Sequence, residues 1–215
     1  MSPPLLLGHR GARASHHIPE NTLASFELCL QHGCDGFEFD VRLSADGQAV
    51  ICHDASVRGM KIATTASERL ALPTLEDVLK QFAGRAFLDI ELKVVGLELQ
   101  TVAELRKHPP QKGYVVSSFL PEVLATSRTL DPAIPLGFLC EKKTQLRGWR
   151  DIAADWVIPH FDLVDRELVE LVHGAGRKIM VWTANRAERM REFAMWEVDA
   201  IISDETELLV RSAIT

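Results

Sequence analysis

The sequence predicts an α/β fold: a single (β/α)8 barrel, or TIM barrel, that occupies residues 1–215. Short apolar runs of strand length alternate with longer segments of helical period along the whole chain. No Pro-, Gly- or Ser-rich linker and no repeat interrupts this alternation, which favours one domain. No Gly-x-Gly-x-x-Gly motif follows the first run, which disfavours an open dinucleotide-binding sheet. Because such barrels usually have about 250 residues, the loops must be short.

Nine apolar runs are strand candidates, one more than an eightfold barrel needs. They begin near Leu5, Gly36, Ala49, Ala86, Tyr114, Pro135, Trp156, Lys178 and Asp199. The run Gln48 to Cys52 follows a short, turn-rich link, Ser-Ala-Asp-Gly at residues 44–47, that cannot hold a crossover helix. We therefore expect this run to pair antiparallel with its predecessor as a local hairpin.

Segments of helical period lie between these runs. They follow Asn21, Thr74, Glu98, Pro121, Asp165, Arg186 and Glu205. Several begin at a residue of the type that caps helix N-termini, namely Asn21, Thr74 and Asp165. Two are expected to end on glycine, at His32-Gly33 and His173-Gly174.

Charge and hydropathy exclude several classes of protein. A formal net charge of -6 argues against a nucleic-acid partner, because phosphate backbones are bound through clustered Lys and Arg. No apolar stretch approaches the roughly 20 residues that a membrane helix needs. The four cysteines have no Cys-x-x-Cys spacing and are expected to be reduced, structural thiols. We expect a soluble cytoplasmic protein without stable membrane insertion, whose oligomeric state is left open.

Ionisable side chains gather at the downstream ends of four apolar runs. They are His9 and Arg10, Glu38 and Asp40, His53, and Glu91 and Lys93. The corresponding ends of parallel barrel strands point to one face, where active sites are built. A spacing of two places both members of a pair on the same side of a strand. The seven groups are therefore expected to converge.

Three carboxylates at one barrel mouth, from Glu38, Asp40 and Glu91, would repel one another unless a cation neutralised them. Oxygen ligands without thiolates suit a hard divalent cation such as Mg2+, Ca2+ or Mn2+. Two histidines on the same face supply an acid and a base, and Arg10 and Lys93 supply positive charge for an anion. Together these groups suit phosphoryl chemistry on a small-molecule phosphodiester substrate.

Each group also has a purely structural interpretation: a salt-bridge network of Glu38 and Asp40 with Arg10 and Arg42, a paired strand end at Glu91 and Lys93, and a turn with an Asx cap at His53-Asp54. The coincidence of all of them on one face favours the functional interpretation.

The motifs that contain these residues occur in a recognisable order: Gly8-His9-Arg10-Gly11, Pro19-Glu20-Asn21-Thr22, Glu38-Phe39-Asp40-Val41, His53-Asp54 and Glu91-Leu92-Lys93. The series resembles the glycerophosphodiester phosphodiesterase family, and the likeness covers nearly the whole chain. The resemblance implies that Glu38, Asp40 and Glu91 are metal ligands, that His9 and His53 are the acid/base pair, and that Arg10 and Lys93 contact the substrate phosphate.

Trp182 matches an aromatic residue of the family that can line the leaving-group side of the barrel mouth, although barrel core is an alternative. Asn21 and Thr22 are interpreted as helix caps. The resemblance further implies hydrolysis of a glycerophosphodiester, such as glycerophosphocholine, to glycerol 3-phosphate and an alcohol.

One segment departs from the family pattern. Members usually carry a long insertion with an Arg-Thr-Thr stretch after the His-Asp motif, whereas here a short segment, Ala55 to Leu72, leads to Pro73. This shortened insertion predicts a more open site, so the identity of the alcohol and of the glycerol group stays open.

Two other functions are compatible with the sequence. One is a phospholipase D-like hydrolase of lysophospholipids, which would be expected to carry an apolar membrane-binding loop. The other is a catalytically silent metal- or phosphate-binding barrel, against which the paired histidines argue. The choice of metal, and of direct water attack or a cyclic intermediate, also stays open.

Overall fold

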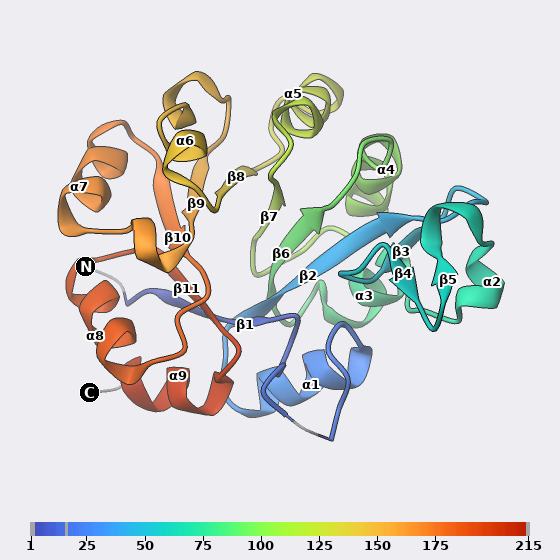
Figure 1. Cartoon of the computed structure of the whole chain (residues 1–215), viewed down its shortest axis with the longest axis horizontal. Coiled ribbons are helices and arrows are strands. Elements are labelled where there is room, and N and C mark those ends of the chain that lie inside the picture. Colours follow the sequence, from blue (N-terminus) through green and yellow to red (C-terminus); the bar gives the residue numbers. More distant parts are fainter. Residues whose placement is uncertain (1–2, 16, 214–215) are drawn as a thin grey trace.

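A computed structural model describes residues 3–15 and 17–213 and has a closed barrel of parallel strands at its centre (Figure 1). The barrel strands are β1 (Leu5–His9), β2 (Gly36–Leu43), β6 (Phe87–Leu92), β7 (Tyr114–Ser118), β8 (Leu136–Cys140), β9 (Trp156–Pro159), β10 (Lys178–Val181) and β11 (Ala200–Ser203). Each pairs in parallel with its neighbours, and β1 closes the sheet by pairing with both β11 and β2. The predicted (β/α)8 fold is confirmed.

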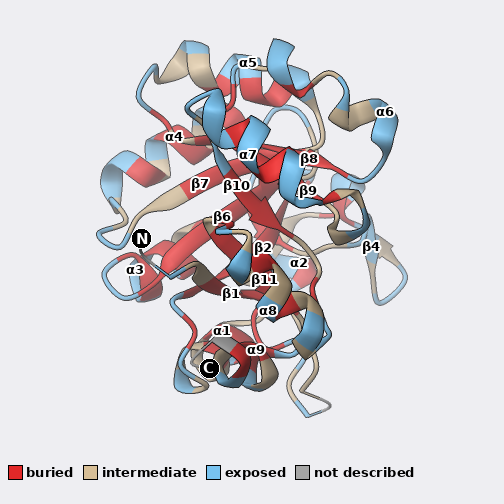
Figure 2. Cartoon of the chain, turned by 90° about the vertical axis from the view of Figure 1, so that its left-hand side faces the viewer, coloured by how far each residue is buried: buried red, intermediate tan, exposed pale blue. Residues whose placement is uncertain are grey.

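Helices connect the strands and cover the outside of the barrel (Figures 1 and 2). They are α1 (Leu23–Gln31), α3 (Leu75–Phe82), α4 (Glu98–Lys107), α5 (Pro121–Leu130), α6 (Lys143–Leu146), α7 (Arg166–Gly174), α8 (Ala187–Met195) and α9 (Thr206–Ala213). The helix between β8 and β9 is only four residues long, which is too short for helical periodicity to show in the sequence. Within the described residues, no helix is long and apolar enough to cross a membrane.

The ninth apolar run forms β3 (Ala49–Ile51), which pairs antiparallel with β2 as predicted, with Val41 opposite Ile51. The shortened insertion follows it and projects beside the barrel (Figure 1). It consists of small elements: β4 (Ser56–Val57), β5 (Met60–Lys61), a 3-10 turn (Ile62–Thr64) and α2 (Ser67–Leu70).

Two apolar cores hold the barrel together. The inner core fills the barrel with side chains such as Leu7, Trp156 and Met180. The outer core lies between sheet and helices, where Phe26 of α1 stacks on Phe37 of β2 with ring centroids 4.3 Å apart. Both rings are fully buried, and burial of a Phe side chain stabilises a fold by roughly 1.5–3 kcal/mol.

One of the predicted helix boundaries is wrong. Thr22, not Asn21, caps α1, because its hydroxyl accepts the backbone N–H of Ser25 at 3.1 Å. Asn21 has a φ of +57° and turns its side chain elsewhere. The predicted end of α7 at His173-Gly174 agrees with the structure, because Gly174 is the last residue of the helix; the glycine with a left-handed backbone, Gly176 with a φ of +71°, lies two residues beyond it.

The other predicted helix ends agree with the structure. Thr74 and Asp165 cap their helices, and Gly33, with a φ of +97°, follows α1. The four cysteines are free thiols, as expected.

Candidate active site

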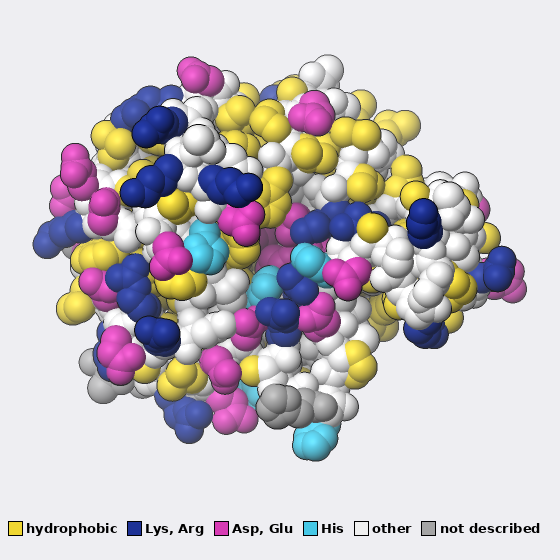
Figure 3. All heavy atoms as spheres, viewed as in Figure 1, with side chains coloured by type: hydrophobic (Ala, Val, Ile, Leu, Met, Phe, Trp, Pro, Cys, Tyr) yellow, Lys and Arg dark blue, Asp and Glu magenta, His cyan; other side chains and the backbone are white. Residues whose placement is uncertain are grey.

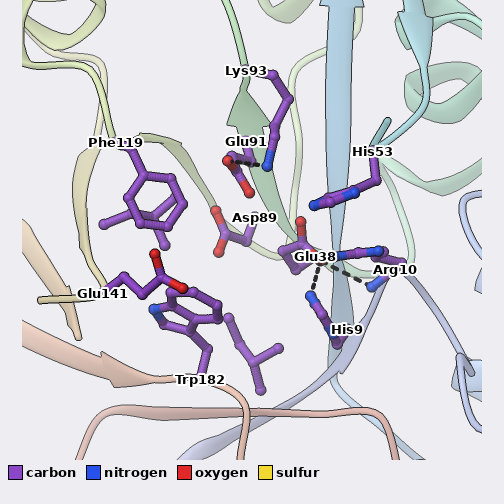
Figure 4. A pocket seen from close by; sticks show the side chains of 12 residues that line it. His9, Arg10, Glu38, His53, Asp89, Glu91, Lys93, Phe119, Glu141 and Trp182 are labelled. Carbon is purple, nitrogen blue, oxygen red and sulfur yellow. Dashed lines mark hydrogen bonds and ion pairs between the residues drawn. The ribbon is translucent and has the colours of Figure 1, made fainter. Parts of the chain in front are cut away.

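The downstream ends of the barrel strands surround a pocket of about 310 Å3. Acidic, basic and histidine side chains gather around the hollow that Figure 3 shows at the centre of this face. The residues that line the pocket are His9, Arg10, Glu38, His53, Asp89, Glu91, Lys93, Phe119, Leu139, Glu141, Trp182 and Ile202 (Figure 4). Seven of the eight candidate residues are among them. The eighth, Asp40, is buried and pairs with two of the lining residues.

The three candidate carboxylates lie together on two neighbouring strands. Glu38 and Asp40 come from β2, and Glu91, opposite Asp40 in the parallel register, comes from β6. One oxygen from each lies within 4.8 Å of the others. The Lys93 ammonium is 2.7 Å from Glu91 Oε1 and 3.2 Å from Asp40 Oδ1, so it neutralises part of this negative charge.

The surroundings separate the pKa values of these carboxyls. Burial, together with the charges of Asp40 and Glu91, raises the pKa of Glu38 well above its ordinary value. Burial also raises the pKa of Glu91 to about 7, although Lys93 opposes the shift. Burial alone would raise the pKa of Asp40 as well, but Lys93, Arg10 and a hydrogen bond from Asn21 hold it below its usual range.

Oxygen atoms of this cluster are available to a cation. Glu38 Oε1 is buried and accepts no hydrogen bond from the residues that the structure describes. Asp40 Oδ1 and Glu91 Oε1 are also buried and contact only the Lys93 ammonium within salt-bridge distance. Unpaired buried carboxylate oxygens are costly, and an oxygen-ligated divalent cation would satisfy them. The donor set therefore fits such an ion.

A strained turn after β1 brings the first motif to this cluster. Arg10 has a φ of +54°, which is rare for a residue other than glycine, and its backbone N–H donates to Glu38 Oε2 at 2.9 Å. The next residue, Gly11, has a φ of +82°, and a Cβ there would lie 2.5 Å from the Ser25 hydroxyl. The turn thus requires glycine and fixes Glu38 through the backbone.

His9 is buried at the end of β1 and is held by an aspartate from the last strand–helix connection. Its Nδ1 lies 2.7 Å from Asp204 Oδ1. Asp204 in turn accepts hydrogen bonds from Asn185 at 2.7 Å and from Arg13 at 3.1 Å. Burial lowers the pKa of His9, against the raising effect of Asp204. With Nδ1 committed to Asp204, Nε2 is the nitrogen that can exchange a proton at the pocket.

His53 is the more exposed histidine, with 36% of its side chain accessible. It follows β3, and its Nδ1 lies 2.8 Å from Asp54 Oδ1. Arg42 donates to the His53 carbonyl at 2.7 Å and so holds the backbone of this loop. Arg42 therefore supports the loop, rather than joining Glu38 and Asp40 in a salt-bridge network.

Glu20 and Asn21, from the motif Pro19-Glu20-Asn21-Thr22, position side chains of the site. Glu20 accepts from Arg10 Nη1 at 2.8 Å, while Arg10 Nε lies 3.3 Å from Asp40 Oδ2. Asn21 donates to the same Asp40 oxygen at 2.8 Å. The left-handed backbone of Asn21, which removes it from the cap position, is what aims its amide at Asp40. Its interpretation as a cap concealed this contact.

Aromatic rings form the opposite side of the pocket. Trp182 and Phe119 are nearly perpendicular, with ring centroids 5.6 Å apart. The Trp182 indole N–H donates to the Ile158 carbonyl at 3.0 Å, which fixes the ring. Trp182 also packs against the inner core, so it belongs both to the core and to the pocket wall.

Asp89 is a pocket residue that the sequence interpretation missed. It precedes Glu91 by two residues on β6, is fully buried, and accepts a hydrogen bond from the Ser117 hydroxyl at 2.6 Å. Its Oδ2 has no hydrogen-bond partner in the described part of the chain. Burial raises the pKa of Asp89 to about 7.

Replacing Asp89 with Asn is expected to raise the free energy of unfolding of the chelator-treated protein at pH 8 by roughly 2 kcal/mol, which is less than the whole rise in the pKa of Asp89 would give. Between its ordinary pKa of 3.8 and about 7, the unfolded state loses the proton first, so wild-type stability falls as pH rises. Asn keeps an acceptor for Ser117 and cannot ionise. Denaturant unfolding at pH 5.5 and 8 measures the difference, with the exposed Asp151→Asn as control. An equal gain at both pH values would contradict the expectation.

Comparison with known proteins shows what this chain is similar to. The sequence profile of the Glycerophosphoryl diester phosphodiesterase family matches residues 9–208. A glycerophosphodiester phosphodiesterase from Caldanaerobacter subterraneus subsp. tengcongensis is 29% identical, with 96% of each chain covered.

Solved structures agree with the sequence comparison. A phosphodiesterase from Oleispira antarctica, solved in complex with the product sn-glycerol-3-phosphate, matches with a TM-score of 0.87 and 26% identity over 99% of this chain and 98% of that one. A glycerophosphodiester phosphodiesterase from Thermotoga maritima matches with a TM-score of 0.85 and 25% identity over 98% of this chain and 99% of that one.

Proposed function

The chain belongs to the glycerophosphoryl diester phosphodiesterase family, and on that premise we propose that it hydrolyses glycerophosphodiesters to glycerol 3-phosphate and an alcohol, using a divalent cation and two histidines. The observation that carries the proposal is the convergence of three carboxylates and two aspartate-held histidines on one pocket. The product complex of the Oleispira antarctica relative supports a small phosphodiester as the substrate.

Glu38, Asp40 and Glu91 would hold the cation, with Mg2+ or Ca2+ the preferred candidates and Mn2+ a third. When bound, such an ion would withdraw charge from a phosphoryl oxygen. Arg10 and Lys93 bring two further positive charges to the same wall, where they bind and orient the phosphate.

The two histidines differ in burial and in their partners, and we assign them different proton-transfer roles on that basis. Because burial lowers its pKa, His9 is neutral near pH 7, and Asp204 stabilises the charge that it acquires on accepting a proton. We assign His9 as the base that withdraws a proton from the nucleophile. His53 lies at the pocket mouth beside Asp54, where it can take up a proton from solvent and deliver it to the leaving alkoxide.

Removal of the cation provides the direct test. Protein stripped with a chelator is expected to release glycerol 3-phosphate from glycerophosphocholine, glycerophosphoethanolamine and glycerophosphoglycerol at least about 100-fold more slowly than protein resupplied with Mg2+, Mn2+ or Ca2+. An enzyme-coupled assay for glycerol 3-phosphate measures the rates and ranks the ions.

Other outcomes point to other functions. Cleavage of bis(p-nitrophenyl) phosphate alone, with the same metal dependence, would mean that the shortened insertion has changed the substrate. Release of choline from lysophosphatidylcholine alone would indicate the phospholipase D-like function. Tight metal binding without cleavage of any diester would indicate a silent binding protein and overturn the proposal.

A further inference from the structure

The two sides of the pocket differ in charge. The cationic and histidine side chains that line it, Arg10, Lys93, His9 and His53, stand on the side of β1, β2 and β6 (Figure 4). The facing side is aromatic and apolar, with Phe119, Trp182, Leu139 and Ile202. Glu141 is the ionisable residue that lines the pocket on this second side. The first side also holds the carboxylates Glu38, Asp40 and Glu91, so with a divalent cation held there as proposed, the pocket would present positive charge to one end of a ligand and negative charge to the other.

Glu141 is the first residue after β8 and is exposed at the pocket mouth. Its backbone N–H donates to Gln145 Oε1 at 2.9 Å, which fixes the residue at the start of α6. Its carboxylate makes no hydrogen bond or salt bridge within the described ranges 3–15 and 17–213. Figure 4 shows the carboxylate turned into the pocket beside the Trp182 ring. Its charge is therefore available to a ligand.

The aromatic rings beside Glu141 suit a cation. Among aromatic side chains, tryptophan attracts cations most strongly. The hydrogen bond from the Trp182 indole N–H to the Ile158 carbonyl fixes the orientation of this ring. Lys93 already lies 5.9 Å from the centroid of the Phe119 ring, on the side of the carboxylates. Trp182 is the second ring of this wall: Phe119 and His160 pack against it with ring centroids 5.6 and 5.3 Å away, and its remaining surface lines the pocket next to the unpaired Glu141 carboxylate.

We propose that Glu141 and Trp182 form a subsite for a positively charged alcohol group, so that the enzyme prefers glycerophosphodiesters whose alcohol carries an amine or quaternary ammonium. This inference rests on the proposed function. With the phosphate held against Arg10 and Lys93, the alcohol points to the aromatic side, where Glu141 neutralises its charge. A neutral alcohol gains nothing from that carboxylate.

The test compares substrates that differ in the charge of the alcohol. Glu141→Gln is expected to lower kcat/KM for glycerophosphocholine and glycerophosphoethanolamine by about three- to tenfold, mainly by raising KM, and to change kcat/KM for glycerophosphoglycerol less than about twofold. Glu141→Lys is expected to enlarge the loss for the charged substrates. Glu197→Gln, which removes an exposed carboxylate at the opposite end of the barrel, serves as the matched control.

Choline alone gives a readout that does not depend on turnover of a charged substrate. It is expected to inhibit hydrolysis of glycerophosphoglycerol competitively, with an inhibition constant that rises about threefold or more in Glu141→Gln. Equal effects of Glu141→Gln on charged and neutral substrates, or an unchanged inhibition constant, would overturn the subsite and leave the proposed function standing. Failure of the wild-type protein to cleave any glycerophosphodiester would overturn both.

Discussion

Replacing Glu91 with Gln is expected to lower kcat/KM for glycerophosphodiesters by a factor on the order of 10³ and to weaken divalent-cation binding by more than about 100-fold. Gln has the same shape but lacks the charge that a hard cation requires. Loss of residues that merely orient metal ligands already costs about 10–100-fold. Glu91 is proposed as a ligand itself, and one of its carboxylate oxygens is among the three that cluster. Steady-state kinetics and calorimetric titration with Mg2+ and Ca2+ measure the two effects.

The same variant should remain folded, which separates loss of the ion from loss of structure. Burial holds the pKa of Glu91 at about 7 beside Asp40, so its charge is unfavourable in the metal-free protein. Glu91→Gln is therefore expected to be at least as stable as wild type in the presence of chelator. Glu98→Gln is the matched control, because Glu98 is also buried but does not line the pocket. Full activity of Glu91→Gln at low cation concentration would refute the proposed ligand set.

The sequence was sufficient to predict the barrel because strand and helix periodicity depend on local spacing. All eight barrel strands begin within one residue of the predicted positions, and the turn-rich link before β3 identified the antiparallel pair. The elements of the insertion were not predicted. Strands of two residues, such as β4 and β5, are too short to show an alternating pattern.

The sequence predicts those residues of the candidate site that lie at the ends of strands, but not the contacts between residues far apart in the chain. His9 and Asp204 are 195 residues apart, and no local pattern indicates that they touch. Asn21 was misassigned because Asn and Thr are both good caps, and only the left-handed backbone at Asn21 decides between them. Asp89 could have been predicted from the sequence, because Asp89 and Glu91 are spaced by two and lie on the same face of β6, with Lys93 directly after the strand.

Removing His53 is expected to affect substrates according to their leaving group. If His53 protonates the departing alkoxide, His53→Ala should lower kcat for glycerophosphocholine by about 10³-fold, within the usual range for general acid catalysis. A p-nitrophenyl ester needs little protonation to leave, so its loss should be roughly tenfold or less. His9→Ala removes the proposed base and should slow both substrates to a similar extent.

Each histidine is paired with an aspartate and both line the same pocket, so their positions alone do not distinguish the acid from the base. The different effects of the two variants on the two substrates make that distinction. His173 offers a matched control, since its Nε2 lies 2.9 Å from Asp199 Oδ2 in a similar pair that does not line the pocket. His173→Ala should leave both rates within about twofold, as is usual for changes away from a reacting group. If His9→Ala, rather than His53→Ala, spares the p-nitrophenyl ester, the two roles are reversed: the acid is then buried on Asp204, and the base stands at the pocket mouth.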